Sequence, residues 1–143
     1  MKTEIDFGKA CLRILDANYN RAKEALRVSE DFSRFLMEDK TLTADFKRAR
    51  HQMTKILLRF PVRYARLVAS RDSVRDIGKK NLIHDRRSNP GWRDIMTANM
   101  KRAQEALRVL EELSKVVSPP GSRAFERLRF HIYELEKRSF RKF

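Results

Sequence analysis

Apolar residues recur every three or four positions along most of the chain, a spacing that is typical of amphipathic helices. The spacing predicts one long helix from about Phe7 to Met37. A second apolar stripe, from Leu42 to Phe60, predicts another helix with Thr41 or Thr43 as its N-cap. Pro61 lacks the backbone N–H that a helix interior needs, so we expect this helix to break or kink there.

The second part of the chain carries a similar pattern. Asn89 as N-cap and Pro90 at the first helical position favour a third helix that runs to about Val117. Ser118–Gly121 contains two prolines and a glycine, so we expect it to stop that helix. The apolar spacing predicts a final helix over about Arg123–Phe140.

A segment without helical periodicity separates these two parts. A short helical extension through Tyr64, Leu67 and Val68 precedes it. We call residues 70–89 the crossover loop, because Gly and Asn interrupt this stretch and it carries no 3.6-residue apolar pattern. Loops of this length are typically lids, binding loops or linkers.

The two parts are related by duplication. Ala17–Leu36 aligns without gaps with Ala98–Val117, and eleven of the twenty positions are identical. Phe46–Arg50 matches Phe125–Arg129 in the same order. We therefore expect an all-α protein, a four-helix bundle in one domain (1–143), with a first hairpin over 1–69 and a second over 90–143.

The chain is strongly basic, with 33 Lys and Arg against 19 Asp and Glu and a formal net charge of +14. Residues 1–40 are neutral overall, whereas residues 41–92 carry thirteen basic and four acidic side chains. Such a surplus favours nucleic acid, an acidic membrane surface or a polyanionic small molecule as partner. Charges interrupt every apolar run, which argues against a membrane span, and the single cysteine and polar start favour the cytoplasm.

One polar motif, Asn-x-x-Arg-x-x-Glu, falls on the apolar face of both repeat helices. Its copies are Asn18, Arg21 and Glu24, and Asn99, Arg102 and Glu105. Burying an amide and a guanidinium costs several kcal/mol unless each finds partners. Two readings stay open: an internal network with i, i+3 ion pairs that fixes register, or a shared cavity that binds anionic oxygens.

Further round the same helices, Arg27 with Glu30 and Arg108 with Glu111 fit solvated i, i+3 ion pairs better than ligand contacts. No Cys/His cluster for zinc, no common phosphate-binding loop and no nucleophile elbow occurs in the sequence. The residue content therefore excludes several common chemistries.

The crossover loop combines basic, acidic and flexible positions. Arg71, Asp72, Arg75, Asp76 and Gly78 lie within eight residues. Two carboxylates among arginines fit a Mg²⁺ ion that bridges phosphates, because Mg²⁺ is often held by one or two carboxylates together with substrate oxygens. The two aspartates could equally be local salt-bridge partners.

Three segments together resemble a known family. They are Leu12–Val28, Arg71–Gly78 and Ala98–Arg108, and they occur in the family's order over nearly the whole chain. The chain is similar to the monofunctional hydroxymethylpyrimidine-phosphate kinase family of thiamin biosynthesis, whose members occur alone or fused ahead of thiamine-phosphate synthase.

The resemblance implies transfer of the ATP γ-phosphoryl group to 4-amino-5-hydroxymethyl-2-methylpyrimidine phosphate, with Mg²⁺ as cofactor. Positioning and cationic stabilisation dominate such transfers. The hypothesis assigns phosphate oxygens to Arg21, Arg102 and Arg71, substrate or phosphate binding to Asn18, Asn99 and Gly78, orientation of the arginines to Glu24 and Glu105, and Mg²⁺ to Asp72 or Asp76.

Two other functions stay open. The chain could be a noncatalytic accessory module of thiamine-phosphate synthase, or a basic helical protein that binds nucleic acid. The sequence has no recognition helix or RNA-binding motif, and its first forty residues are neutral, which argues against nucleic acid. A homo-oligomer or an association with thiamine-phosphate synthase is compatible with the sequence, and no membrane partner is expected.

Overall fold

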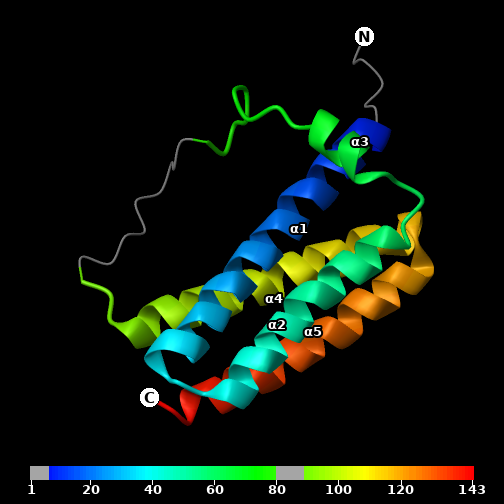
Figure 1. The fold of residues 1–143 in the computed structure, drawn as a ribbon. Coiled ribbons are helices and arrows are strands. Elements are labelled where there is room, and N and C mark those ends of the chain that lie inside the picture. Colours follow the sequence, from blue (N-terminus) through cyan, green and yellow to red (C-terminus); the bar gives the residue numbers. More distant parts are fainter. Residues whose placement is uncertain (1–6, 80–88) are drawn as a thin grey trace.

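The computed structural model describes residues 7–79 and 89–143, and regular structure in these ranges is helical (Figure 1). Its elements are α1 (Phe7–Asp31), the π-helix η1 (Phe32–Leu36), α2 (Lys40–Leu58), α3 (Tyr64–Ala69), α4 (Trp92–Val117) and α5 (Pro119–Phe140). Neither described range contains a β-strand, so the predicted all-α class is confirmed.

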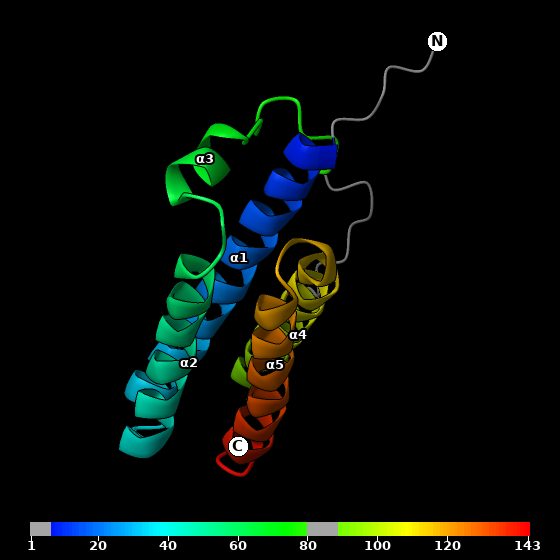
Figure 2. The ribbon, with the colours of Figure 1, turned by 90° about the vertical axis from the view of Figure 1, so that its right-hand side faces the viewer.

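The four long helices pack side by side. Helix α1 contacts both α2 and α4, while α5 contacts both α4 and α2, and the short α3 lies against α1. Figure 2 shows α1 with α2 on one side of the molecule and α4 with α5 on the other. The two repeat helices, α1 and α4, are therefore direct neighbours.

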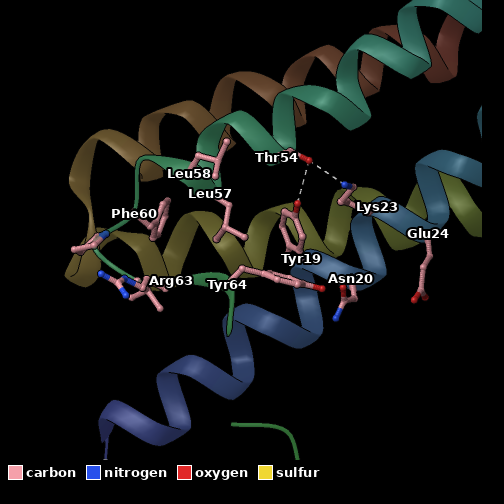
Figure 3. Close-up of a pocket in the computed structure, with 12 residues that line it drawn as sticks. Tyr19, Asn20, Lys23, Glu24, Thr54, Leu57, Leu58, Phe60, Arg63 and Tyr64 are labelled. Atoms are coloured by element: carbon pink, nitrogen blue, oxygen red, sulfur yellow. Dashed lines mark hydrogen bonds between the residues drawn. The ribbon is translucent and has the colours of Figure 1, made fainter. Parts of the chain in front are cut away.

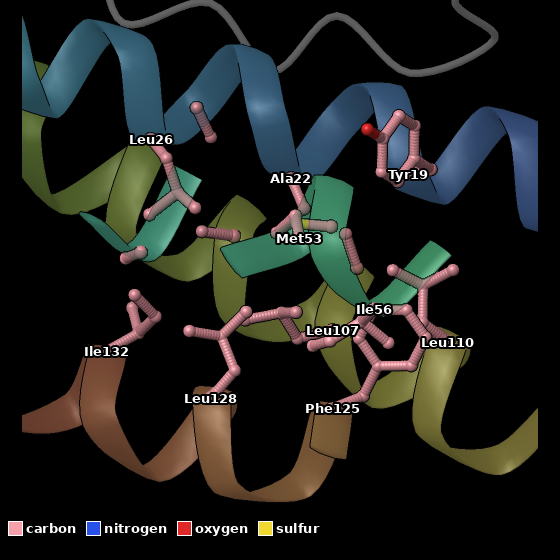
Figure 4. Packing of buried hydrophobic residues seen from close by; sticks show 14 of the residues in the cluster. Tyr19, Ala22, Leu26, Met53, Ile56, Leu107, Leu110, Phe125, Leu128 and Ile132 are labelled. Carbon is pink, nitrogen blue, oxygen red and sulfur yellow. The ribbon is translucent and has the colours of Figure 1, made fainter. Parts of the chain in front are cut away.

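Small buried side chains recur in both repeat helices. Ala22 and Ala25 of α1 and their repeat equivalents Ala103 and Ala106 of α4 are all buried. Small side chains allow packed helices to approach closely. Larger apolar side chains fill the space toward α2 and α5 (Figure 4): Leu26, Met53, Ile56, Leu107, Leu110, Phe125, Leu128 and Ile132.

The first repeat helix ends earlier than the apolar pattern predicts. The α-helical geometry stops at Asp31, and η1 replaces the last turns of the helix expected to reach Met37. The Met37 N–H donates to Phe32 O at 2.9 Å, the i→i+5 bond of a π-turn. Glu38 then has a φ of 52°, a left-handed conformation that turns the chain toward α2.

Helix α2 begins at Lys40, two residues before its apolar stripe. Its N-cap is Asp39, whose Oδ1 accepts a hydrogen bond from the Leu42 N–H at 2.8 Å, so the predicted caps Thr41 and Thr43 are wrong. Asp is among the strongest N-cap residues, because its short carboxylate reaches the free N–H groups of the first turn. The cap therefore fixes where the first hairpin turns.

The second hairpin turns in an equivalent way. Ser118 caps α5 by accepting from the Gly121 N–H at 3.3 Å, and Pro119 and Pro120 occupy the first helical turn. The segment therefore ends α4 as predicted, but the last helix begins at Pro119 rather than at about Arg123. Proline is well tolerated in a first turn, where its missing N–H would have no intrahelical partner.

Helix α4 begins later than predicted. Gly91, rather than Asn89, is its N-cap, and the Gly91 N–H donates to Oδ2 of Asp94 at 3.0 Å. Pro90 therefore lies outside the helix. The acidic side chain in the first turn of the helix satisfies the backbone at the cap, which explains the shift.

The crossover loop is described only in part. Residues 80–88, including Arg86 and Arg87, lie outside the described residues. The predicted division into hairpins over 1–69 and 90–143 within one domain stays a prediction. In the described ranges, none of the helices combines the length and apolar character that a membrane span requires.

Candidate functional site

The two copies of the polar motif line one cavity between α1 and α4. We call this cavity of about 520 Å³ the repeat groove; it is lined by Asn18, Arg21, Glu24, Arg102, Glu105, Ala106 and Val109. Five of the six motif residues thus come together. The sixth, Asn99, lines an adjacent cavity that also includes Arg102.

The motif asparagines are buried and make the same contact in both repeats. The Asn18 side-chain amide donates to Ile14 O and that of Asn99 donates to Ile95 O, each at 2.9 Å. The carbonyl oxygen of Asn18 also accepts a hydrogen bond from Arg21 at 3.3 Å. Each asparagine side chain is therefore fixed by a backbone carbonyl of its own helix. In the first repeat, Asn18 also orients Arg21.

The motif arginines are exposed, in contrast to their expected place in the apolar face. Arg21 and Arg102 begin near that face, but their long side chains reach solvent, as flexible cationic side chains commonly do. Among the described residues, neither forms an ion pair, so the predicted pairs with Glu24 and Glu105 are not formed. The repeat groove therefore presents two guanidiniums and two carboxylates that form no ion pair within residues 7–79 and 89–143.

A second duplicated set of charged residues forms ion pairs within the protein. Glu30 of α1 binds Arg50 of α2, and the equivalent Glu111 of α4 binds Arg129 of α5, each with an N–O distance of 2.8 Å. The hydrogen bond from Arg129 to Glu111 raises the pKa of Arg129, against the opposing effect of burial. Both glutamates are buried.

These pairs correct the expectation for the neighbouring arginines. Arg27 does lie 3.9 Å from Glu30, but it also lies 3.5 Å from Asp31. Arg108 pairs with Glu112 at 3.2 Å rather than with Glu111. The glutamates turn inward because an arginine on the partner helix can satisfy them there.

The described start of the crossover loop is anchored to α1. Both oxygens of the buried Asp16 accept hydrogen bonds from Arg71, at 2.5 Å from Nε and 2.8 Å from a terminal nitrogen. This fork raises the pKa of Arg71 above its ordinary value, with a further contribution from Tyr64. Asp16 was missed as a site residue, although it lies within the family-like segment Leu12–Val28.

A cavity of about 300 Å³ lies beside this anchor. It is lined by Arg13, Asp16, Ala17, Asn20, Arg71, Asp72, Ser73 and Asp76. Two expected metal ligands, Asp72 and Asp76, thus share a cavity with Arg71. Gly78 does not line it, and its φ is not positive.

Local contacts engage both of these aspartates. Asp72 accepts from the Arg75 N–H at 3.1 Å, and Asp76 accepts from the Gly78 N–H at 2.8 Å. Two carboxylates are compatible with Mg²⁺, but the part of the chain that the structure describes contains no group of three or more potential metal ligands. ATP and Mg²⁺ stay predictions.

The largest of the cavities described here was not predicted from the sequence. It measures about 820 Å³ and lies between α1, α2 and the segment that leads to α3 (Figure 3). Its residues are mainly apolar or aromatic and come from separate segments, so no linear motif marks it. Asn20 and Glu24 of α1 border it as well as the cavities described above.

These features define an all-helical protein with a duplicated hairpin and cavities lined by charged side chains along its first helix. The chain belongs to the ThiD2 family, whose model matches residues 13–138. The expected resemblance to a thiamin-biosynthesis family is thus confirmed at the level of the family. No solved structure gives a significant match.

Relatives of the chain carry the name thiamine-phosphate synthase. The protein of Synechocystis is 36% identical over 127 residues, and that of Thermosynechococcus vestitus is 37% identical over 130 residues. These alignments cover 89% and 91% of this chain and 35% of each relative. The Rhodopirellula baltica protein is 34% identical over 88% of this chain and 33% of its own length.

The chain therefore spans about a third of the length of the curated relatives it matches. Their names contradict the expected kinase function. They point instead to a role related to thiamine-phosphate synthase, which agrees better with the alternative of an accessory module.

Proposed function

We propose that this chain is a helical module that acts with thiamine-phosphate synthase in thiamine biosynthesis and binds a phosphorylated compound in the repeat groove. The similarity to proteins of that name carries the proposal. It extends over about nine tenths of this chain but only a third of the relatives, as expected for a module that recurs inside a larger protein.

The charges of the repeat groove suit a ligand that is both anionic and cationic. A phosphate monoester has a second pKa near ~6, so it is mostly dianionic at neutral pH. Arg21 and Arg102 can each bind phosphate oxygens through a guanidinium fork. Glu24 and Glu105 would repel phosphate but attract a positive ring or amino group, and thiamine phosphate carries such groups.

In this proposal the module binds and does not perform the transfer step. The groove lining consists of Asn, Arg, Glu, Ala and Val, which supply hydrogen bonds and charges for binding. The transfer chemistry would belong to the synthase with which the module acts. Such a module could raise the local concentration of a phosphorylated compound.

A titration tests the binding step. Isothermal titration calorimetry with thiamine phosphate should give a dissociation constant at least about tenfold lower than with thiamine, because only the former offers a phosphate to the arginines. The double variant Arg21→Gln/Arg102→Gln should abolish this preference. The matched control Arg123→Gln/Arg127→Gln removes the same charge from exposed positions of α5 and should keep it.

An enzyme assay tests the connection with the synthase. Thiamine-phosphate synthase from the same organism should form thiamine phosphate faster, or at lower substrate concentration, when the chain is added or fused to it. The Arg21→Gln/Arg102→Gln variant should lose that effect. An unchanged synthase, together with tight nucleic-acid binding that weakens steeply with salt, would reject the module in favour of a nucleic-acid-binding protein.

A further inference from the structure

The cavity of about 820 Å³ has a polar end and an apolar wall. In Figure 3, Lys23 and Thr54 lie toward one end, and Leu57, Phe60 and Tyr64 follow along the cavity. The volume is within the range of small-molecule sites, which are typically lined by apolar and aromatic side chains with a few polar groups.

The polar end is built around one ammonium group. Lys23 Nζ donates to Thr54 Oγ1 at 2.9 Å, and the hydroxyl of the buried Tyr19 lies 3.1 Å from the same oxygen. The ammonium also lies 5.4 Å from the centre of the Tyr19 ring. No described carboxylate pairs with Lys23, so a half-buried cation faces the cavity without a counterion.

The charged side chains that line the cavity leave it positive as a whole. Glu24 borders the cavity, but Figure 3 shows its carboxylate directed away from the Lys23 ammonium. Arg63, at the opposite end in this view, adds a second cation that has no ion pair among the described residues. An anion bound beside Lys23 would meet two donors, the ammonium and the Thr54 hydroxyl.

The apolar wall is preformed. Phe60 is buried and its ring packs 5.9 Å from that of Phe125. Gly121 also lies against this ring, since an added Cβ there would come 2.5 Å from a carbon of the Phe60 ring. The wall is therefore held by the core, whereas the exposed Tyr64 ring lies across the cavity beneath Tyr19 in the view of Figure 3.

We propose that this cavity is a second binding site, separate from the repeat groove, for a flat-ring compound that carries an anionic group. The anion would lie at Lys23 and Thr54, and the ring would lie against Leu57 and between the tyrosines. Aromatic side chains favour stacked or edge-on contacts with such rings, and a cation without a counterion favours an anion. This inference goes beyond the proposed function and does not depend on thiamine-phosphate synthase.

Binding of simple probes to the full chain tests it. Phenyl phosphate supplies both ring and anion, inorganic phosphate supplies the anion, and benzyl alcohol supplies the ring. Phenyl phosphate should bind at least about tenfold more tightly than either of the others, because it can use both parts of the cavity. In ¹H–¹⁵N spectra it should shift the amide signals of Lys23, Thr54 and Tyr64.

Variants locate the site. Lys23→Gln keeps a hydrogen-bond donor for Thr54 but removes the charge, and should weaken phenyl phosphate about tenfold. Tyr64→Ala, at an exposed position, should weaken it about threefold or more. The control Lys55→Gln removes an exposed charge from helix α2, one residue from Thr54, and should leave the affinity unchanged.

Two results would overturn the inference. One is equal affinity for phenyl phosphate and inorganic phosphate. The other is loss of phenyl phosphate binding in Arg21→Gln/Arg102→Gln but not in Lys23→Gln, which would place the probe in the repeat groove. Failure of the synthase assay would leave the inference intact, because these measurements use the chain alone.

Discussion

Helices α1 and α4 each carry two duplicated sets of charges, and the two sets have opposite surroundings. Glu30 and Glu111 are buried and bound to an arginine of the neighbouring hairpin helix. Arg21 and Arg102 are exposed, line the repeat groove and form no ion pair among the described residues. We call the glutamate set closed, because both glutamates are ion-paired, and the arginine set open, because neither arginine has an ion pair among the described residues.

The difference follows from which helices meet at each set. The closed pairs join α1 to α2 and α4 to α5, so they lie inside each hairpin. The open arginines lie where the two hairpins meet, in the repeat groove. One duplicated sequence thus contributes charges to packing at one place and leaves charges available for a ligand at the other.

Removing one partner of the closed set should have the largest effect. Glu111→Ala leaves the guanidinium of Arg129, whose side chain is 9% exposed, without a counterion. We expect the free energy of unfolding in urea to fall by about 3–5 kcal/mol. Glu105→Ala, an exposed glutamate on the same helix, should change it by less than about 0.5 kcal/mol. Equal losses of unfolding free energy in Glu111→Ala and Glu105→Ala would show that the buried ion pair stabilises the fold no more than an exposed glutamate does.

The anchor of the crossover loop should have an intermediate effect. Asp16→Asn removes a buried charge from a pair whose arginine side chain is 37% exposed. We expect a loss of about 1 kcal/mol in the free energy of unfolding, because solvent screens the arginine. Limited proteolysis should also cut residues 70–79 faster, whereas Asp72→Asn should leave the cutting rate unchanged. Unchanged cutting in Asp16→Asn would mean that Arg71 does not anchor the loop.

An ion pair between the hairpins, from Arg138 of α5 to Asp45 of α2, predicts a smaller dependence of stability on pH. Burial alone would raise the pKa of Asp45, but hydrogen bonds from Arg138 and Arg48 together lower it below its ordinary value of 3.8. A lowered pKa in the folded state stabilises the protein above the unfolded pKa, and this contribution is lost as the pH falls through the folded pKa. Below about pH 3.8, Asp45→Asn should therefore reduce the slope of unfolding free energy against pH. An identical slope would contradict the pairing.

The open set should have the smallest effect on stability. Because neither guanidinium has an ion pair to lose, Arg21→Gln/Arg102→Gln should change the free energy of unfolding by less than about 0.5 kcal/mol per substitution. Urea unfolding measures this beside Arg123→Gln/Arg127→Gln. A loss comparable to that of Glu111→Ala would favour the alternative reading of the motif as an internal network.

The duplication and the helical class could be predicted because both are written in the local sequence. Eleven identities in twenty positions and a 3.6-residue apolar period need no tertiary information. The helix ends were harder to predict, because residues near Asp39 and Ser118 are also good N-caps and the sequence does not say which of them is used.

The charged side chains show why the site was only partly predictable. A helical wheel gives the direction in which Arg21 leaves the helix, but not where its long side chain ends. The partner of Glu30 is an arginine on another helix, so a search for i, i+3 pairs could not find it. The cavity beside Lys23 is formed by segments that are adjacent only after folding.

The turn formed by η1 and Glu38 accounts for a difference in chain length between the two halves. The closed pairs are separated by 20 residues in the first half and by 18 in the second, yet their N–O distances are the same. The two additional residues are taken up between α1 and α2, where the π-turn and the left-handed Glu38 lie. This turn is therefore the place where a change in chain length after duplication could persist without moving any core residue out of register.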